Sequence, residues 1–183
     1  MKNREYKSRR NKLAKAIGKD GVAIIATADL STRTNDTYYP FRSDSDFYYL
    51  TGFLEPNSLM LLAPGRPEGE FILCVRPKNP LMETWEGHME GLNGVIKNYD
   101  VDQSFDIANI DVVLKDLLYG KEKIFYSIGK NNFYDEKVTE VFKVLRESQR
   151  QGGVVPNEIV SIDTIIHEMR QIKSRKEIQL MKQ

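Results

Sequence analysis

The sequence has little of several residue types that carry chemistry in proteins. Among 183 residues there are one cysteine, two histidines and one tryptophan, and the formal net charge is only +1. A single cysteine cannot form an intramolecular disulfide, and a balanced charge argues against nucleic acids or anionic membranes as partners. The sequence also lacks a signal peptide and the roughly 20 consecutive apolar residues of a membrane-spanning helix. We therefore expect a cytoplasmic globular protein.

Familiar catalytic and metal-binding motifs are missing as well. Neither His88 nor His167 has a partner at ligand spacing, and HEMRQ (residues 167–171) ends in glutamine where a zinc-protease helix carries its second histidine. There is no G-x-S-x-G motif and no phosphate loop, and Cys74 in FILCVR is typical of a buried residue in a strand. We expect no metal ligands and no catalytic residues in this chain, with His167 structural or at the rim of a site.

One stretch imitates a calcium-binding loop. From Asp44 to Glu55 the first and third residues are aspartates and the twelfth is a glutamate, as in a helix-loop-helix calcium site. Tyr48 and Tyr49 occupy the fifth and sixth positions, where that site needs an oxygen ligand and a glycine. The sequence therefore argues against calcium, and the pair of Asp36 and Asp44 remains as a candidate for acid–base work.

Hydrophobic periodicity predicts both strands and helices, which alternate in the second half of the chain. β-Branched and aromatic runs bounded by turn residues indicate strands, whereas apolar residues at spacings of three and four indicate helices. Hairpins join the first strands and helices separate the later ones, so the pattern predicts an α/β domain with a mixed sheet. The predicted strands are 22–26, 46–52, 58–65, 70–77 and 123–129, and the predicted helices are 2–17, 107–120 and 134–153.

The last ten residues, SRKEIQLMKQ, predict a further helix. Ser174 and Glu177 stand in the S-x-x-E register of a capping box, ahead of Ile178 and Leu180. So short a helix is below the roughly 12 to 15 residues at which isolated helices hold in water, so it needs a partner to pack on. We interpret the chain as the front part of a longer protein; the alternative is a frayed C-terminal helix that docks on its own domain.

Two polar and aromatic loops are candidates for binding. The alternative is structural: tyrosines in the core, aspartates that cap or turn the chain, and a tryptophan that fills a gap. The residues alone leave both interpretations open. The first loop, STRTNDTYYPFRSDSDFYYLTG, holds Asp36, Tyr38, Tyr39, Arg42, Asp44 and Asp46, and the second, METWEGHMEG, holds Trp85.

Three motifs together resemble the amino-terminal domain of aminopeptidase P, also called Xaa-Pro aminopeptidase, within the creatinase/prolidase amino-terminal domain family. They are YPFRSDSDFYYLTGFLEPNSLMLL, METWEGHMEG and IIHEMRQIKSRKEI, and the resemblance runs from the first helix to the last residue. It implies a three-layer α/β fold, ribonuclease H-like, with a mixed β-sheet flanked by helices. It also implies that residues 1–172 form this domain and that residues 173–183 begin the first helix of a catalytic pita-bread domain.

The resemblance implies a role without catalysis of its own. In such families the front domain mediates oligomerisation and lines the substrate site of a neighbouring subunit, so the implied partners are the catalytic domain, neighbouring subunits and proline-containing peptides. By position in the motifs, Asp36 and Trp85 are the implied substrate-binding residues. Two divalent ions, usually manganese, are held by the catalytic domain, so this chain is expected to be inactive alone. One departure is EGHMEG after Trp85, which is more acidic than the pattern there.

Two alternatives remain at this point. The first is the front domain of a prolidase, an enzyme that cleaves dipeptides only. The second is a protein-binding module of the same fold whose parent has lost its metals. Rates on Xaa-Pro and Xaa-Pro-Yaa substrates would distinguish a prolidase from an aminopeptidase P. The presence of metal ligands downstream would exclude the protein-binding module.

Overall fold

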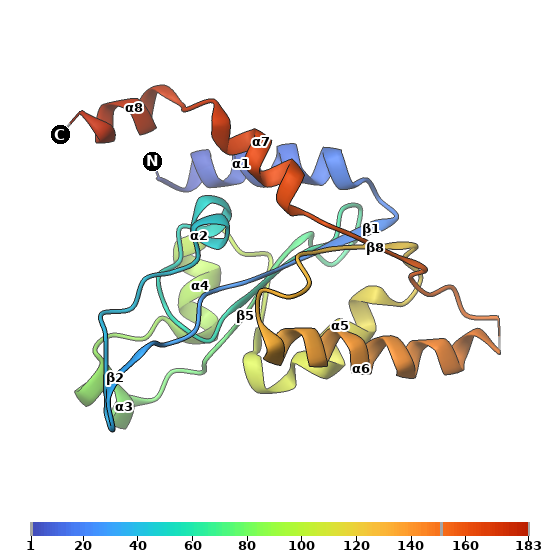
Figure 1. Cartoon of the computed structure of the whole chain (residues 1–183), viewed down its shortest axis with the longest axis horizontal. Helices are drawn as coiled ribbons and strands as arrows, with labels where there is room; N and C mark the ends of the chain where they lie inside the picture. The colour runs from blue at the N-terminus through green and yellow to red at the C-terminus, as the bar shows by residue number, and fades with distance from the viewer. Residues whose placement is uncertain (1, 151, 183) are drawn as a thin grey trace.

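The computed structural model describes residues 2–150 and 152–182. The chain contains both helices and strands, and Figure 1 shows their arrangement. In order, the elements are α1 (Lys2–Ile17), β1 (Gly21–Ala26), β2 (Thr32–Thr34), β3 (Thr37–Tyr38), α2 (Ser45–Thr51), β4 (Leu59–Leu62), β5 (Phe71–Val75), α3 (Pro80–Glu86), α4 (Gly91–Tyr99), β6 (Gln103–Asp106), the short 3-10 helix η1 (Ile107–Asn109), α5 (Ile110–Leu118), β7 (Lys123–Tyr126), α6 (Asn132–Gln149), β8 (Glu158–Val160), α7 (Asp163–Gln171) and α8 (Arg175–Met181).

A six-stranded mixed sheet forms the middle layer, in the order β6-β5-β4-β1-β7-β8. Strand β4 runs antiparallel to both neighbours, with Met60 opposite Leu73 of β5, and every other adjacent pair is parallel. The inner strands β4 and β5 are buried along their whole length, which explains their nearly continuous apolar sequences. The predicted mixed sheet is confirmed.

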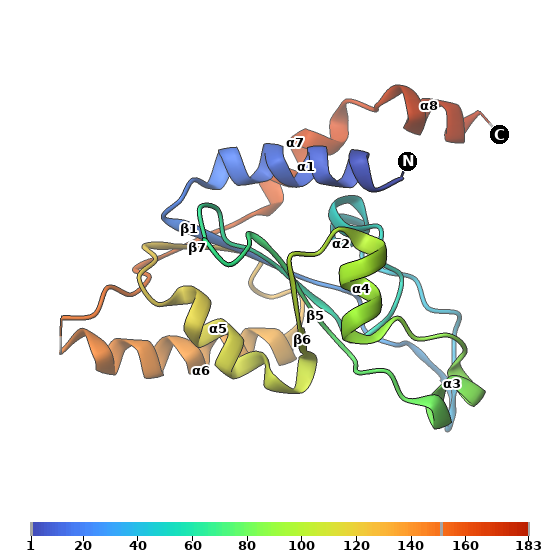
Figure 2. The same cartoon turned by 180° about the vertical axis from the view of Figure 1, so that it is seen from behind.

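Helices cover both faces of this sheet, so the molecule has three layers (Figures 1 and 2). Successive strand residues point to opposite faces. Ile24 and Leu61 face α5 and α6, whereas Ile25 and Met60 face α1, α2, α4 and α7. The expected α/β architecture with flanking helices is therefore confirmed, and so is the burial of Cys74 within β5.

Helix α2 (Ser45–Thr51) occupies nearly all of the predicted strand 46–52, so that prediction is wrong. The Asp44 side chain accepts hydrogen bonds from the backbone N–H groups of Asp46 and Phe47, at 2.8 and 3.0 Å, and so caps the helix. At the other end Gly52 takes the left-handed conformation, with φ of 71°, that ends many helices. The aromatic residues suggested a strand because they favour β structure, but the two caps decide the conformation.

Replacing Asp44 with alanine tests this cap. We expect the free energy of unfolding to fall by about 1 kcal/mol, because two N–H groups at the start of α2 lose their acceptor. Urea denaturation measures the change. Asp44→Asn keeps an acceptor oxygen and should retain most of the stability, and an alanine variant as stable as the original chain would contradict the capping role.

The predicted final helix is present as α8, and polar contacts join its start to α1. The capping box is complete, since Ser174 Oγ accepts from the Glu177 N–H at 3.1 Å and Glu177 Oε2 accepts from the Ser174 N–H at 2.7 Å. Ser174 Oγ also donates to Glu5 at 2.5 Å, and Arg9 pairs with Glu177 at 3.2 Å. No helix in residues 2–150 and 152–182 is long and apolar enough to cross a membrane.

Candidate functional site

The β2–β3 hairpin holds Asp36 in its turn. Its strand residues are all exposed, so the hairpin lies outside the core. The Tyr39 N–H donates to the Ser31 carbonyl at 2.9 Å, which closes the hairpin, and Thr37 Oγ1 donates to Asp36 Oδ1 at 3.3 Å. Asp36 itself is exposed, so its carboxylate is presented to solvent.

Trp85 lies on the short helix α3, none of whose residues is buried. The helix begins because the Asn79 side chain accepts from the N–H groups of Leu81 and Met82, at 3.1 and 3.3 Å, and because Pro80 suits the first helical turn. Trp85 is 87% exposed and Leu81 is 80% exposed. Two large apolar side chains on one short helix are thus in contact with solvent, which makes this helix a candidate for an interaction surface.

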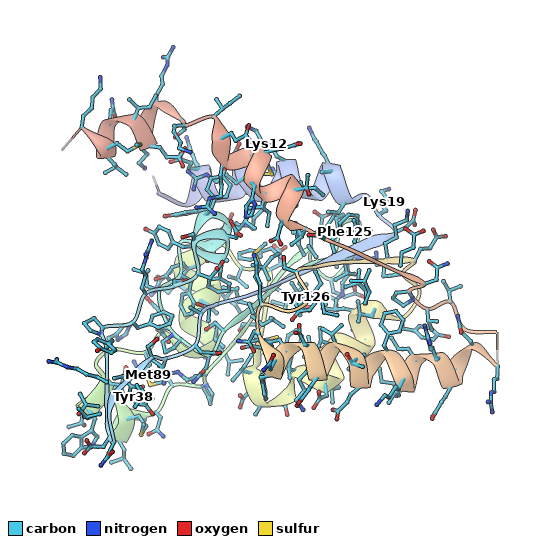
Figure 3. All side chains as sticks on the ribbon, viewed as in Figure 1. Lys12, Lys19, Tyr38, Met89, Phe125 and Tyr126 are labelled. Carbon is cyan, nitrogen blue, oxygen red and sulfur yellow. The ribbon has the colours of Figure 1, made fainter. Side chains whose placement is uncertain are left out.

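Asp36 and Trp85, the two residues expected to bind substrate, belong to separate elements that reach the same end of the molecule. The hairpin and α3 both lie at the lower left of Figure 1, away from the two termini. Tyr38 and Met89, which follow these two residues along the chain, lie there as well (Figure 3). This end therefore presents the Asp36 carboxylate and the Trp85 indole to solvent.

The loop after α3 is held by Glu83. Its Oε1 accepts from the Met89 N–H at 2.9 Å and lies 3.3 Å from the Lys78 ammonium and 3.4 Å from His88 Nδ1. The hydrogen bond from Met89 is the largest of the effects that lower the pKa of Glu83. His88, which has no ligand partner at sequence spacing, thus lies between Glu83 and Glu90.

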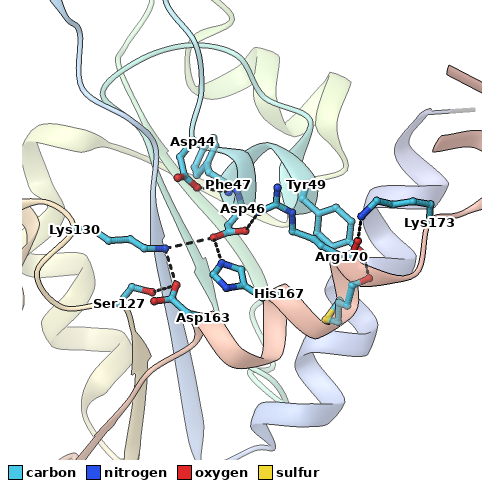
Figure 4. Close-up of polar contacts among 11 residues, drawn as sticks. Asp44, Asp46, Phe47, Tyr49, Ser127, Lys130, Asp163, His167, Arg170 and Lys173 are labelled. Atoms are coloured by element: carbon cyan, nitrogen blue, oxygen red, sulfur yellow. Dashed lines mark hydrogen bonds and ion pairs between the residues drawn. The ribbon is translucent and has the colours of Figure 1, made fainter. Parts of the chain in front are cut away.

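A second cluster of charges centres on the buried Asp46 (Figure 4). Asp46 Oδ1 accepts a short hydrogen bond from Arg170, and Oδ2 lies 3.4 Å from both Lys130 Nζ and His167 Nε2. Nearby, the Tyr49 hydroxyl donates to the Met169 carbonyl at 3.0 Å. The motif that contains Asp46 and the motif HEMR therefore meet in space, across 124 residues of sequence.

Asp163 joins this cluster from the start of α7. It accepts from Ser127 Oγ at 2.7 Å and from Lys130 Nζ at 2.6 Å. Burial would raise the pKa of Asp163, but the hydrogen bonds from Lys130 and Ser127 outweigh burial and lower it. Burial likewise disfavours the charged Lys130, yet the contacts with Asp163 raise the pKa of its ammonium. Each partner stabilises the charged form of the other.

Three side chains in this cluster have the chemistry of metal ligands. Asp46, Asp163 and His167 each offer one atom, and these atoms lie within 4.8 Å of one another. Lys130 contacts both carboxylates, however, and Arg170 contacts the second oxygen of Asp46. Two cations already balance the two carboxylates, so a divalent ion would meet repulsion there. The arrangement fits an ion-pair network better than a metal centre.

A cavity of about 300 Å³ opens beside this network, at the carboxyl ends of β1 and β7. Such an edge of an α/β sheet often binds ligands. Here the polar lining is already paired: Asn131 Nδ2 donates to both carboxylate oxygens of Asp29, at 3.0 and 2.9 Å, and Asp44 caps α2. Asp44 thus has a structural role, away from the hairpin turn that holds Asp36.

Sequence reasoning did not identify Asp163, Lys130, Arg170 or Glu83 as partners at these sites. For the Asp46 network no local signal existed, because its members are separated by as many as 124 residues. For Glu83 a signal was present in METWEGHMEG, where a glutamate precedes a tight glycine turn. That glycine, Gly87, has φ of +86°, and the turn brings Met89 back to Glu83.

Known proteins resemble this chain over almost its whole length. "Xaa-Pro aminopeptidase" of Escherichia coli is 29% identical over 183 residues, which is all of this chain and 42% of that protein. "Intermediate cleaving peptidase 55, mitochondrial" of Arabidopsis thaliana is 27% identical over 98% of this chain and 34% of its own length. The chain therefore spans about two fifths or less of these relatives.

Solved structures give the same assignment. The Pseudomonas aeruginosa aminopeptidase PepP superposes with a TM-score of 0.94 at 37% identity, over 98% of this chain and 40% of that one. A structure described as zinc-substituted E. coli aminopeptidase P in complex with product gives 0.91 at 29%, over 97% and 40%. The family model "Aminopeptidase P, N-terminal domain" matches residues 6–126, more than half of the chain. The chain belongs to the family of aminopeptidase P N-terminal domains.

Proposed function

We propose that this chain is the non-catalytic front domain of a Xaa-Pro aminopeptidase, a hydrolase that removes the N-terminal residue preceding proline. The proposal is supported by relatives of that name that match the chain throughout while extending well beyond it. Residues 1–172 form the domain in this proposal, and residues 173–183 begin the catalytic domain. The catalytic groups would lie in that second domain, so the 183-residue chain alone would be inactive.

We further propose that the end bearing Asp36 and Trp85 lines the substrate site of a neighbouring subunit in a homo-oligomer. The observation that carries this proposal is the 87% exposure of Trp85 on a helix with no buried residue. An indole offers a large apolar face with a polar N–H, which suits a proline ring at the edge of a cleft. The Asp36 carboxylate would hold the positively charged amino end of the peptide.

Trp85→Ala in the full-length protein tests this role. We expect kcat/KM for Xaa-Pro-Yaa peptides to fall about tenfold, which corresponds to roughly 1.4 kcal/mol of transition-state binding. The reason is the loss of apolar contact with the proline, since Trp85 buries little surface within its own chain. Initial rates over a range of peptide concentrations give the two constants separately.

Two controls make the result decisive. Size-exclusion chromatography must show an unchanged oligomer, because loss of assembly would also lower activity. Val112→Ala removes an exposed apolar side chain on α5, 71% exposed, and should leave the rates unchanged. Unchanged kinetics in Trp85→Ala at the native oligomeric state would contradict the proposed role.

Metal content and substrate length test the rest of the proposal. We propose that the catalytic domain holds two divalent ions, manganese in the native enzyme, while the carboxylates described above remain ion-paired. Activity lost on chelation and restored by manganese supports this. Equal or faster cleavage of Xaa-Pro dipeptides would favour a prolidase, and absence of both metal and activity would favour a protein-binding module.

A cytoplasmic location is also proposed, and cell fractionation tests it against the mitochondrial location named for the Arabidopsis relative.

A further inference from the structure

Helix α3 needs an external support to hold Trp85 in one place. The helix has seven residues and none of them is buried. Isolated helices shorter than roughly 12 to 15 residues are marginal in water, so neither length nor packing fixes α3. Its position must be set by the contacts at its two ends.

Glu55 provides such a contact beyond the C-terminal end of α3, at Glu90, the residue that precedes helix α4. Its Oε1 accepts a hydrogen bond from the Glu90 N–H at 2.7 Å, across 35 residues of sequence. Glu55 comes from the connection between α2 and β4, so this bond joins the segment after Trp85 to the central part of the domain. The adjacent Met89 is only 3% exposed, which adds an apolar anchor at the same point.

Glu55 itself stands on a rigid part of the chain. The buried Ser58 hydroxyl lies within hydrogen-bonding distance of the carbonyls of Glu55 and Pro56, at 3.3 and 3.1 Å. Pro56 restricts the backbone further, and Phe53, two residues before Glu55, is fully buried. The carboxylate therefore projects from a fixed point.

The surroundings of the Glu55 carboxylate disfavour its charged form. Burial raises the pKa of Glu55, although the Glu90 N–H and the positive charge of Arg76 act against that rise. Glu55 Oε2 and Arg76 Nε are both buried, and neither has a hydrogen-bond partner among the residues that the structure describes. Arg76 Nη1 in turn binds Glu86, next to Trp85, at 2.6 Å. Buried polar groups left unpaired call for an explanation beyond stability.

We propose that Glu55 is a positioning residue, which holds the segment after α3 through the Glu90 N–H and thereby fixes Trp85 for a peptide bound in the neighbouring subunit. The inference rests on the proposed function of Trp85. Glu55 touches neither the substrate nor the reacting atoms in this arrangement. It acts only through the segment that carries the indole.

The positioning can be measured without any enzymatic activity. In the Glu55→Leu variant we expect amide hydrogen exchange at Glu90 to become about tenfold faster, because the N–H loses its acceptor. The anisotropy of Trp85, the single tryptophan of the chain, should fall at the same time. Glu55→Gln keeps the Oε1 acceptor and should restore both signals.

Glu147→Leu is the matched control, since it removes an exposed glutamate on α6 and should change neither signal. Faster exchange throughout the chain would mean general destabilisation, and it would overturn the positioning role. Unchanged exchange at Glu90 and unchanged anisotropy in Glu55→Leu would overturn it as well.

A double-mutant cycle in the full-length enzyme separates this inference from the function on which it rests. If Glu55 acts through Trp85, Glu55→Leu lowers kcat/KM in the original enzyme but has no further effect in Trp85→Ala. Additive losses would overturn the positioning role. If Trp85→Ala is silent, the proposed function fails, while the exchange and anisotropy measurements still decide whether Glu55 fixes the segment.

Discussion

Replacing Gly52 with alanine is expected to lower the free energy of unfolding by about 2–5 kcal/mol. Gly52 has φ of +71°, a conformation that costs other residues roughly 1–2 kcal/mol. A Cβ atom there would lie 2.4 Å from Cε2 of the Tyr6 ring, so the aromatic ring or helix α1 would have to move. Overpacking of this kind adds about 1–3 kcal/mol. Urea denaturation measures the total.

Gly18→Ala provides the matched control for this prediction. Gly18 has nearly the same φ, +73°, but an added Cβ would meet no atom within 4 Å. The stability lost in Gly18→Ala should therefore reflect the backbone conformation alone. The difference in unfolding free energy between Gly52→Ala and Gly18→Ala then measures the effect of the contact with Tyr6. Tyr6→Ala should recover part of the loss when combined with Gly52→Ala. Equal losses at Gly18 and Gly52 would show that the contact with Tyr6 is not tight.

The second large effect is expected for Asp46→Ala, which should cost about 2–3 kcal/mol. Removing one partner of a buried ion pair typically costs 3–5 kcal/mol. We expect less here because Lys130 and Arg170 are partly exposed, with side-chain exposures of 48% and 36%, and water can compensate them. The loss should loosen α7 from α2, since Asp46 joins these helices. Thermal and urea unfolding measure it.

Asp111→Ala is the comparison for Asp46. Asp111 pairs with Lys137 at 2.8 Å, but its side chain is 48% exposed, against 6% for Asp46. Exposed pairs contribute about 0–1 kcal/mol, so the loss at Asp111 should be smaller. Asp46→Asn tests the charge separately, because the amide is similar in shape to the carboxylate. Equal losses for Asp46→Ala and Asp111→Ala would contradict the network as an important support of α7.

Much of the fold was predictable because its signals are local. The apolar runs that became β1, β4, β5 and β7 are bounded by glycine or proline, and the helical spacing of α5 and α6 matches their buried faces. Gly18 ends α1 as expected, since its N–H donates to the Ala14 carbonyl at 3.0 Å. These features depend on residues only a few positions apart, so periodicity and turn chemistry suffice to find them.

Helix α2 was not predicted because composition and capping gave opposite signals. Tyr48 and Tyr49 favour a strand, while Asp44 and Gly52 are the caps of a helix. Phe47 and Leu50 are both fully buried, and their spacing of three places them on one helical face. A run of seven residues is too short to distinguish the three-residue spacing of a helix from the two-residue alternation of a strand.

The candidate site shows a similar division. The exposure of Trp85 and Asp36 agrees with their place in stretches rich in polar residues, although Trp85 lies on helix α3 and not in the expected loop. The contact of Glu55 with Glu90 and the convergence of Lys130 and Arg170 on Asp46 depend on the packing of α2, α3 and α7 around the sheet. A single sequence carries no signal for contacts between such distant residues, and only the folded structure shows which residues meet.

The order of synthesis delays the contacts between α1 and the segment that begins α8. Arg9 and Glu5 leave the ribosome early, but their partners Glu177 and Ser174 are made about 170 residues later. At roughly 5–20 residues per second, α1 exists for about 8 to 34 seconds before these partners appear. Leu13 also packs in the same cluster as Ile166 of α7. The first helix of the nascent chain therefore gains these polar partners about 170 residues after it is made, whereas its apolar residue Leu13 shares a cluster with Phe47 and Leu50 of α2, which are made much earlier.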